Sequence, residues 1–289
     1  MNTQDPKFLE QVEQAVREAG QIFYDRTKAS HMKHKGVTDF VTEVDLSVQT
    51  FLKERLAQIA PQVQLMGEEK DNSDLDFEKP MWILDPVDGT MNLVHGFRHS
   101  AVSLALADKG QVELGLVYDP YAGELFSARR GGGAFVNGEA IHVSTARRLA
   151  DCLVDVGTNP SQRELADRNF RWLRAVYDRC HDVRRVGAAS VDLCYVAAGR
   201  LDAYVESGLK PWDFAAGLLI VQEAGGAALT ADGAAPLPEN GRRRHGHQRG
   251  RDGGTAGGAA SGSERVNINT EQSFLTDRRS SLLCRSVLV

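Results

Sequence analysis

Apolar side chains recur at helical spacing near the start of the chain. Between residues 8 and 23 they return every third or fourth position, and a second series follows between residues 46 and 59. This spacing places the apolar groups on one face of a helix and the polar groups on the other. We therefore predict two amphipathic helices that cover a core, through Phe8, Leu9, Val12, Val16, Ala19, Ile22 and Phe23 in the first and Leu46, Val48, Phe51, Leu52, Leu56 and Ile59 in the second.

Apolar runs separated by turn residues then predict an antiparallel sheet. Two runs, 101–107 and 112–118, are joined by Asp108-Lys109-Gly110, and a third run covers residues 124–128. Runs of this length joined by short Gly-containing turns are typical of hairpin-connected strands. We therefore expect an N-terminal α+β lobe over residues 1–145.

The order of elements changes from about residue 146. Strand-like segments now alternate with helix-like segments, in the order 153–157, 163–180, 183–186, 190–198 and 201–205. This β-α-β-α-β order is typical of an α/β unit. We therefore expect a C-terminal α/β lobe over residues 146–235, which also contains a helix that follows Pro211 and ends at Gly225-Gly226.

Length and composition are compatible with two packed lobes. The chain has 289 residues, of which 42% are hydrophobic, and no apolar run approaches the roughly 20 residues of a membrane span. The formal net charge of −5 disfavours a nucleic-acid partner for the body of the protein. The polar start is unlike a secretory signal, and the four cysteines lack C-x-x-C spacing. We therefore expect a cytoplasmic protein with reduced thiols and no membrane contact.

The stretch from Trp82 to Asn92 carries the clearest chemical signal. An apolar strand runs into Asp85 and Asp88, with Pro86 between them and Gly89 directly after. Pro86 pushes the residue before it toward extended geometry, and Gly89 lets backbone amides approach a ligand closely. Oxygen ligands beside amide donors at a helix start suit a divalent metal that bridges to a phosphate. The same residues also form surface turns, so this motif alone leaves both interpretations open.

Other charged positions repeat this pattern in weaker form. Glu68 and Glu69 follow a glycine and a predicted strand over residues 63–66, and Asp213 lies in the first turn of a later helix. The helix dipole also favours an acid in a first turn, so each of these positions is weak evidence when taken alone. Lys35 lies in a polar loop, where a mobile lysine would be useful near a phosphate site.

Four motifs occur together in one order along the chain. They are Gly67-Glu68-Glu69, Trp82-Ile-Leu-Asp-Pro-Val-Asp-Gly-Thr90, Gly187-Ala-Ala-Ser190, and Trp212-Asp213-Phe-Ala-Ala-Gly217 leading to Glu223-Ala-Gly-Gly226. The set resembles the inositol monophosphatase family over roughly residues 5–230, and Glu206 to Asp213 is most similar to the bacterial inositol-1-monophosphatase branch. The resemblance implies a layered α-β-α-β-α sandwich, usually dimeric. It also implies a magnesium-dependent, lithium-sensitive phosphatase that acts on a small phosphorylated polyol.

The resemblance further implies two to three Mg²⁺ ions and a role for each motif residue. The first ion would be held by Glu68, Asp85 and the carbonyl of Val87, the second by Asp85, Asp88 and Asp213, and a weaker third ion near Glu68. Glu68 and Thr90 would orient the attacking water, and Asp45 would support Thr90. The phosphate would be bound by the amides of Gly89 and Thr90. The inositol hydroxyls would be contacted by Asp88, Ala189 and Glu206, with the Thr158 region lining the pocket.

Electrostatics supports the metal assignment independently. Two carboxylates about 4 Å apart repel each other by about 4 kcal/mol at an effective dielectric near 20. The four converging acids in the motifs therefore require cations. With Mg²⁺ bound, a water can attack the phosphorus in line and no protein nucleophile is needed. A rival class forms an aspartyl-phosphate at an Asp-x-Asp-Gly-Thr corner, but here the aspartates are three positions apart instead of two.

Substrate choice stays open within the resemblance. Related enzymes hydrolyse fructose-1,6-bisphosphate, histidinol phosphate, 3′-phosphoadenosine phosphates or NADP. Glu206 favours a polyol, because a carboxylate accepts hydrogen bonds from vicinal hydroxyls. A function of another class is also open: some bacterial relatives are associated with transcription and ribosomal RNA processing, so a moonlighting scaffold is an alternative.

The C-terminal segment 236–289 departs from the family pattern. Gly and Arg dominate residues 239–254, and Ala, Gly and Ser follow to about residue 263, a composition that cannot bury a core. We expect this segment to be disordered or frame-shifted, and the abrupt switch favours a change of reading frame. A tail that contacts RNA is a further alternative, which the lack of interleaved aromatic residues disfavours. Without the family's final strand and helix, the second sheet should have an uncovered edge or face.

Overall fold

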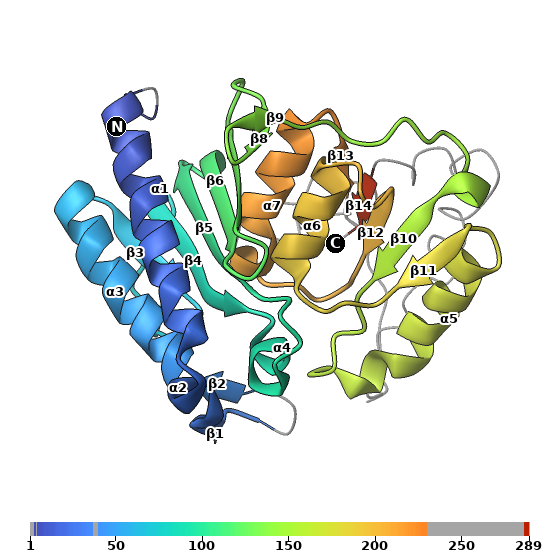
Figure 1. Ribbon diagram of the computed structural model, residues 1–289, viewed down its shortest axis with the longest axis horizontal. Coiled ribbons are helices and arrows are strands. Elements are labelled where there is room, and N and C mark those ends of the chain that lie inside the picture. The colour runs from blue at the N-terminus through green and yellow to red at the C-terminus, as the bar shows by residue number, and fades with distance from the viewer. Residues whose placement is uncertain (1–2, 4, 37–39, 230–285, 289) are drawn as a thin grey trace, which may run out of the picture.

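The helices and strands form layers that alternate α-β-α-β-α, as Figure 1 shows. The computed structural model describes residue 3 and residues 5–36, 40–229 and 286–288. The layers run from α1 and α3, through a seven-stranded sheet, the pair α6 and α7, and a five-stranded sheet, to α5 on the far side. The layered fold that the resemblance implies is therefore confirmed.

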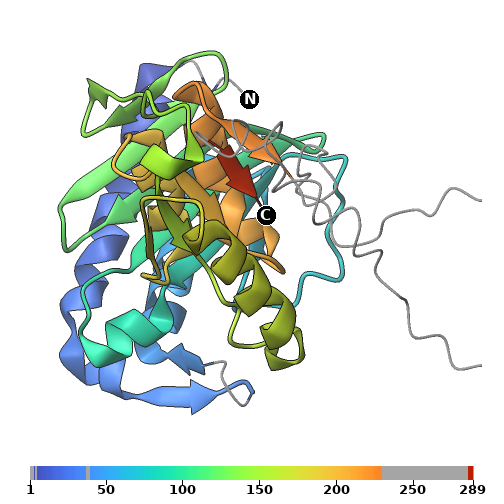
Figure 2. The same ribbon diagram turned by 90° about the vertical axis from the view of Figure 1, so that its right-hand side faces the viewer.

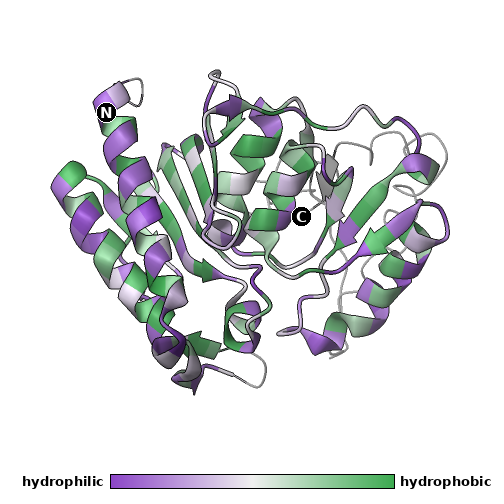
Figure 3. Cartoon of the chain, in the orientation of Figure 1, coloured by the Kyte–Doolittle hydropathy of each residue, from purple (hydrophilic) through white to green (hydrophobic). Residues whose placement is uncertain are grey.

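The outer helical layer consists of α1 (Pro6–Gly20) and α3 (Glu43–Ile59), the two periodic segments of the sequence. Their apolar residues are buried against the first sheet, while their outward faces are hydrophilic (Figure 3). Short elements connect them: η1 (Gln21–Tyr24), α2 (Arg26–Ser30), and the antiparallel pair β1 (Met32–His34) and β2 (Phe40–Thr42). No helix in the described part of the chain is long and apolar enough to cross a membrane.

The first sheet has the order β3-β4-β5-β6-β7-β8-β9, so its strands lie beside their sequence neighbours. The bounds are β3 Gln64–Gly67, β4 Met81–Asp88, β5 Ala101–Asp108, β6 Gln111–Asp119, β7 Glu124–Arg129, β8 Ala134–Val136 and β9 Glu139–Ala140. Only the β3–β4 pair in this sheet is parallel. Alternate residues of β4 enter different cores: Trp82 and Leu84 pack with the outer helices, whereas Met81 and Ile83 pack with the middle layer.

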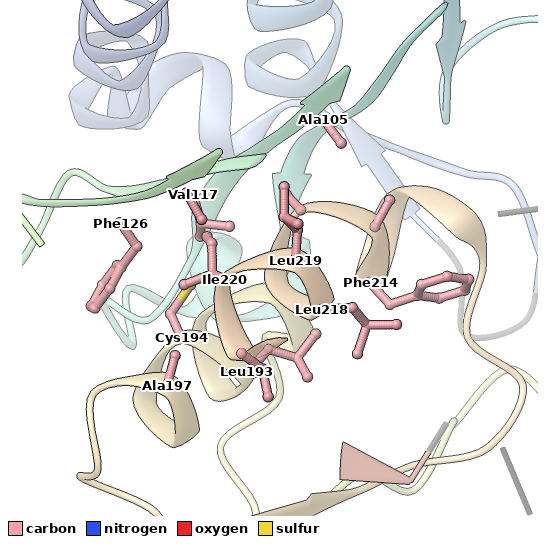
Figure 4. Close-up of a cluster of buried hydrophobic side chains, with 14 of the residues drawn as sticks. Ala105, Val117, Phe126, Leu193, Cys194, Ala197, Phe214, Leu218, Leu219 and Ile220 are labelled. Atoms are coloured by element: carbon pink, nitrogen blue, oxygen red, sulfur yellow. The ribbon is translucent and has the colours of Figure 1, made fainter. Parts of the chain in front are cut away.

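The middle layer consists of α6 (Ala189–Ala197) and α7 (Pro211–Glu223), which are apolar on most of their surface. A helix that is hydrophobic all round belongs inside a protein, and both sheets cover this pair. Figure 4 shows Leu193 and Cys194 of α6 meeting Leu218, Leu219 and Ile220 of α7 under the first sheet. Helix α7 also lies very close to β6 of the first sheet, because Gly115 of β6 has no side chain. A Cβ at Gly115 would lie only 2.7 Å from the Ala216 carbonyl oxygen.

The second sheet is parallel throughout and has the order β11-β10-β12-β14-β13. The bounds are β10 Leu153–Val156, β11 Asp182–Arg184, β12 Ala203–Val205, β13 Ala227–Leu229 and β14 Ser286–Leu288. Helix α5 (Ala166–Tyr177), which follows the one-turn helix η3 (Arg163–Leu165), covers the outer face. The crossover from the first sheet passes through η2 (Leu149–Asp151).

The segment 236–289 contributes one strand to this sheet. Residues 286–288 form β14, which pairs with β12 on one side and with β13 on the other (Figure 2). The expectation of disorder is therefore wrong for these three residues, because Ser-Val-Leu supplies a backbone ladder that both neighbouring strands require. The rest of the segment, including the Gly/Arg-rich stretch with its proposed frame change, lies outside the described residues.

Candidate active site

The corner after β4 brings the two motif aspartates and a glycine together. The register between β4 and β5 shifts between Asp85 and Asp88, where Pro86 interrupts the ladder. Asp85 Oδ1 accepts a hydrogen bond from the Val87 amide at 3.0 Å. Gly89 has φ +83° and caps α4 (Thr90–His95), and a Cβ there would lie 2.9 Å from the backbone oxygen of His99. A side chain at this position would therefore be both strained and obstructed.

Thr90 is held by two oxygens from different parts of the chain. Its Oγ1 lies 3.0 Å from Asp45 Oδ1 and 3.0 Å from the Val87 carbonyl oxygen. Asp45 is in turn fixed in the first turn of α3, where its Oδ2 accepts from the Thr42 amide at 2.8 Å in a capping box. Burial raises the pKa of Asp45, and the hydrogen bonds from Thr42 and Thr90 offset only part of that increase. The structure thus joins Asp45 to Thr90, and the supporting role of Asp45 in the reaction stays a prediction.

Glu68 follows β3 directly and faces the same corner. Its amide donates to the Leu84 carbonyl at 3.2 Å, which fixes it beside the end of β4. Lys35 Nζ lies 3.2 Å from Glu68 Oε1 and also forms an ion pair with Glu69. Burial raises the pKa of Glu68 to about 7 against the lowering effect of Lys35, although the Glu68 side chain stays 24% exposed. Lys35 therefore contacts the acidic site rather than only bordering it.

Asp213 enters from the middle layer. It lies in the first turn of α7, and its Oδ2 accepts from the Lys210 amide at 2.6 Å. Ser103, which pairs with Asp85 across β4 and β5, donates to the Trp212 carbonyl at 3.2 Å. This hydrogen bond links the start of α7 to the strand pair that carries Asp85.

The acidic groups influence one another strongly. Burial raises the pKa of Asp85 well above its usual range, and the carboxylates of Glu68, Asp88, Asp213 and Asp45 raise it further. Burial also raises the pKa of Asp213 well above its usual range, with contributions from Asp88, Glu68 and Glu206. Acids from α3, β3, β4 and α7 thus share one low-dielectric region.

The residues expected at the substrate lie on the second-sheet side of this cluster. Ala189 begins α6, and the next residue, Ser190, donates to Asp88 Oδ2 from both its amide and its hydroxyl, each at 2.6 Å. Glu206 follows β12, where its Oε1 accepts from the Asn159 amide at 3.0 Å and its Oε2 from the Tyr204 hydroxyl. Glu206 also contributes to the raised pKa of Asp88 and Asp213, so it lies near both.

Thr158 lies at the edge of this region. It follows β10, and its Oγ1 accepts from Arg185 Nη2 at 3.2 Å. Its carbonyl accepts from Asn169 Nδ2 at 3.1 Å. The structure thus places Thr158 beside the residues that hold Glu206, with its hydroxyl engaged by Arg185 rather than by the acidic cluster.

The donor set fits a hard divalent cation. It consists of carboxylates and the Val87 carbonyl, which are the oxygen ligands that Mg²⁺ prefers. Among the described residues, no three His, Cys, Asp or Glu side chains converge on one point as they stand. One oxygen of each acid has a partner within the protein: Asp85 Oδ1 the Val87 amide, Asp88 Oδ2 Ser190, Asp213 Oδ2 the Lys210 amide, and Glu68 Oε1 Lys35.

Three structural neighbours of the site received no role from the sequence. Ser190 belongs to one of the four motifs but has no implied role, Asp192 lies in the helix predicted over residues 190–198, and His99 lies in a segment without a recognisable pattern. His99 Nε2 is hydrogen-bonded to Asp192 Oδ1 at 2.9 Å in the interior of the protein. The available signal was the Ser and Asp in the first turn of a predicted helix, a composition typical of helix starts.

Comparison with known proteins agrees with this geometry. The sequence model of the inositol monophosphatase family matches residues 5–273, which extends beyond the motifs themselves. The Nus factor SuhB of Escherichia coli strain K12 is 40% identical over 215 residues, which cover 73% of this chain and 80% of that protein.

Solved structures show the same similarity. The inositol monophosphatase of Anabaena is 31% identical with a TM-score of 0.71, over 80% of this chain and 86% of that one. The inositol monophosphatase II of Staphylococcus aureus with inositol monophosphate bound is 26% identical with a TM-score of 0.67, over 80% of this chain and 84% of that one. This chain belongs to the inositol monophosphatase family.

Proposed function

We propose that this protein is a Mg²⁺-dependent phosphomonoester hydrolase that converts inositol-1-phosphate to myo-inositol and phosphate. The observation that carries the proposal is that the carboxylates of Glu68, Asp88 and Asp213 raise the pKa of Asp85, while those of Asp88 and Glu68 raise the pKa of Asp213. Acids from three separate elements meet in one buried region, which is unfavourable unless cations neutralise them. Family membership supports phosphatase activity in general.

The motif residues would divide the ions between them. Glu68, Asp85 and the Val87 carbonyl would hold one Mg²⁺, Asp85, Asp88 and Asp213 a second, and Glu68 a weaker third. Bound Mg²⁺ lowers the pKa of a water, neutralises the phosphate and stabilises the leaving alkoxide. Lys35 would leave Glu68 when an ion binds there, because one carboxylate oxygen cannot satisfy both cations equally.

The protein's own groups would orient the reactants. Asp45 accepts a hydrogen bond from the Thr90 hydroxyl, which leaves the Thr90 oxygen free to accept one from the attacking water. Glu68 would accept a second hydrogen bond from the same water. The amides of Gly89 and Thr90, at the start of α4, would donate to phosphate oxygens. The attacking water would then give up a proton as it adds to phosphorus and the ester P–O bond breaks, and the departing polyol oxygen would take up a proton.

Glu206, Asp88 and Ala189 would select the polyol. Glu206 is fixed by the Asn159 amide and the Tyr204 hydroxyl, and a fixed carboxylate can accept hydrogen bonds from neighbouring hydroxyls. The Staphylococcus aureus relative binds inositol monophosphate and also 2′AMP, which supports a small phosphate ester as the substrate here. Histidinol phosphate, fructose-1,6-bisphosphate and 3′-phosphoadenosine phosphate are the alternative esters.

Phosphate release from these four esters, measured with and without Mg²⁺ and with millimolar Li⁺, tests the proposal. We expect the highest kcat/KM with inositol-1-phosphate, no release without Mg²⁺, and inhibition by Li⁺. Equal rates without Mg²⁺ would overturn the metal-dependent mechanism. Trapping of a phosphorylated Asp85 or Asp88 during turnover would overturn direct attack by water.

A non-catalytic scaffold is the second candidate, because the relatives with 40% identity are named Nus factor SuhB. Glu68→Gln and Asp88→Asn separate the two functions, since both remove a negative charge from the site and keep the side chain's size. If both variants lose phosphatase activity and cells that carry them show the same phenotype as a gene deletion, catalysis is the cellular role. Retention of the cellular function by both inactive variants supports the scaffold.

A further inference from the structure

A buried pair of side chains joins the two sides of the site. His99 lies in the loop between α4 and β5, and Asp192 lies in the first turn of α6. His99 Nε2 is 2.9 Å from Asp192 Oδ1, and the two side chains are only 10% and 2% exposed. A hydrogen bond that involves an ionisable group is stronger in such an interior than at the surface. Neither side chain has a part in the reaction proposed above.

Asp192 connects this pair to Asp88 through one turn of helix. The Ala188 amide donates to Asp192 Oδ2 at 3.3 Å, which fixes the start of α6. From the same turn, the amide and hydroxyl of Ser190 both donate to Asp88 Oδ2 at 2.6 Å. The position of Asp192 therefore determines where the two donors that hold Asp88 lie.

His99 connects the pair to the other side of Asp88. Its backbone oxygen accepts from Asn92 Nδ2 at 2.8 Å, and a Cβ at Gly89 would lie only 2.9 Å from that oxygen. The neighbouring Ser100 hydroxyl donates to the Gly89 carbonyl at 2.9 Å. The loop that carries His99 thus packs directly against the residue that follows Asp88.

These contacts close a ring. It runs from Asp88 to Ser190, along α6 to Asp192, across to His99, and back through Gly89 to Asp88. We propose that His99 and Asp192 are positioning residues, which close this ring and so hold Asp88 beside α6 in the position that metal binding requires. This inference rests on the proposed function, because it concerns the use of Asp88 as a ligand.

The surroundings make the pair sensitive to loss of the imidazole. Asp155 of β10 lies beside Asp192 and has one carboxylate oxygen, Oδ2, without a hydrogen-bond partner among the described residues. Burial, followed by the Asp192 charge, raises the pKa of Asp155 to about 7. Removal of the His99 imidazole would take a hydrogen bond from Asp192 and leave two neighbouring buried acids, which favours movement of the α6 start.

A matched pair of variants tests the proposal in the full-length chain. Glutamine can place its amide where His99 has Nε2 and can donate or accept, whereas asparagine is one methylene shorter and reaches only the Nδ1 position. Arg200→Gln is the control, because Arg200 pairs with Glu124 between the middle layer and the first sheet but lies outside the ring. The readouts are hydrogen exchange of the metal-free protein and calorimetric titration with Mg²⁺.

For His99→Asn we expect amide exchange at the start of α6 and around Gly89 to rise about tenfold or more, since a buried hydrogen bond is lost. The Mg²⁺ dissociation constant should rise about 10- to 100-fold, as for other groups that orient metal ligands. In His99→Gln, the exchange rates and the Mg²⁺ dissociation constant should stay within about threefold of those of the unmodified protein. Arg200→Gln should change neither the exchange rates nor the dissociation constant.

The outcomes separate the two proposals. Unchanged exchange in His99→Asn, or equal changes in Asn and Gln variants, would overturn the positioning role whatever the protein does with phosphate esters. Increased exchange at the start of α6 and around Gly89 with a normal Mg²⁺ dissociation constant would also overturn the positioning role. If the unmodified protein takes up no Mg²⁺ while exchange responds as expected, the ring holds Asp88 but the proposed phosphatase function fails.

Discussion

The two sheets of this protein are built in different ways. In the first sheet every strand pairs with its sequence neighbour, and β6 runs over nine residues, Gln111–Asp119. In the second sheet the strands have three or four residues, and β14 is placed between β12 and β13 although residues 230–285 separate it from β13. Pairing of sequence neighbours costs less loop-closure entropy than pairing across a long separation. The first sheet is thus specified locally, and the second depends on one distant contact.

This difference corresponds to a division within the site. Asp85 and Asp88 end a strand of the first sheet, and Glu68 follows its neighbour, so most of the acids lie on the locally specified part. Glu206 and Thr158 follow β12 and β10 of the second sheet, on the side where the polyol would lie. Damage to the second sheet should therefore affect substrate contacts first, whereas damage to the β4 corner should affect the acids directly.

Removal of β14 is the strongest test of this comparison. Truncation after Arg285 takes the ladder partner from both β12 and β13, so we expect the second sheet to open and phosphatase activity to disappear. Hydrogen exchange should rise in β10, β12 and β13 and stay slow in β5 and β6. Val287→Pro, which removes a ladder N–H, should act in the same direction. Full protection of β12 in the truncated chain would contradict the role assigned to β14.

Substitution of one proposed ligand from the first sheet and one from the middle layer should have the next largest effect. Asp85→Asn and Asp213→Asn each remove a charge but keep an oxygen that can accept the local backbone hydrogen bond. We expect kcat/KM to fall about 10³-fold in both, the equivalent of several kcal/mol of lost charge stabilisation. In the absence of metal both variants should melt at a higher temperature than the unmodified protein, because a buried repulsion is removed. Asp182→Asn, at an exposed position of β11, is the control. An active Asp213→Asn variant would contradict the proposal that Asp213 shares a metal site with Asp85.

The pH dependence of stability should separate the two regions. Glu68 beside the first sheet and Asp155 in the second both have a pKa raised to about 7. A raised pKa means that the folded state binds the proton more tightly than the unfolded state, so their contribution is complete at low pH and is lost as pH rises through about 7. The free energy of unfolding of the metal-free protein, measured with denaturant, should therefore fall as the pH rises through about 7.

Magnesium should remove only part of this pH dependence. The ion stabilises the charged form of Glu68, whereas Asp155 lies outside the acidic cluster and should continue to titrate. Asp155→Asn should remove the pH dependence of the free energy of unfolding that remains in saturating Mg²⁺. If Mg²⁺ alone abolishes the whole dependence, the assignment of a separate second-sheet component is wrong.

The smallest effect is expected at a surface contact between the regions. Arg200, which follows α6, forms two hydrogen bonds of 2.6 Å with Glu124 of β7. Because the arginine side chain is 40% exposed, Arg200→Gln should lower the free energy of unfolding by less than about 1 kcal/mol. Thermal unfolding and kcat/KM should both stay close to those of the unmodified protein, and a large loss of activity would reveal a role that the geometry does not indicate.

The sequence predicted those features that depend on residues close together in the chain. The period of apolar residues located α1 and α3, and Pro86 with Gly89 located the corner after β4. Contacts between distant segments could not be read in the same way. Nothing near His99 indicates Asp192 as its partner, because the contact exists only after α6 has packed against the first sheet. Strand β14 was missed for the same reason, since Ser-Val-Leu is too short to carry a period.

The place of β14 also has a consequence for biosynthesis. The ribosome makes β12 and β13 before the segment that lies between them, and at roughly 5–20 residues per second the intervening stretch takes on the order of 3 to 10 s to translate. During that interval two parallel edges of the nascent chain lack their shared neighbour. Chaperone binding at this stage would protect the half-finished sheet from association with other nascent chains.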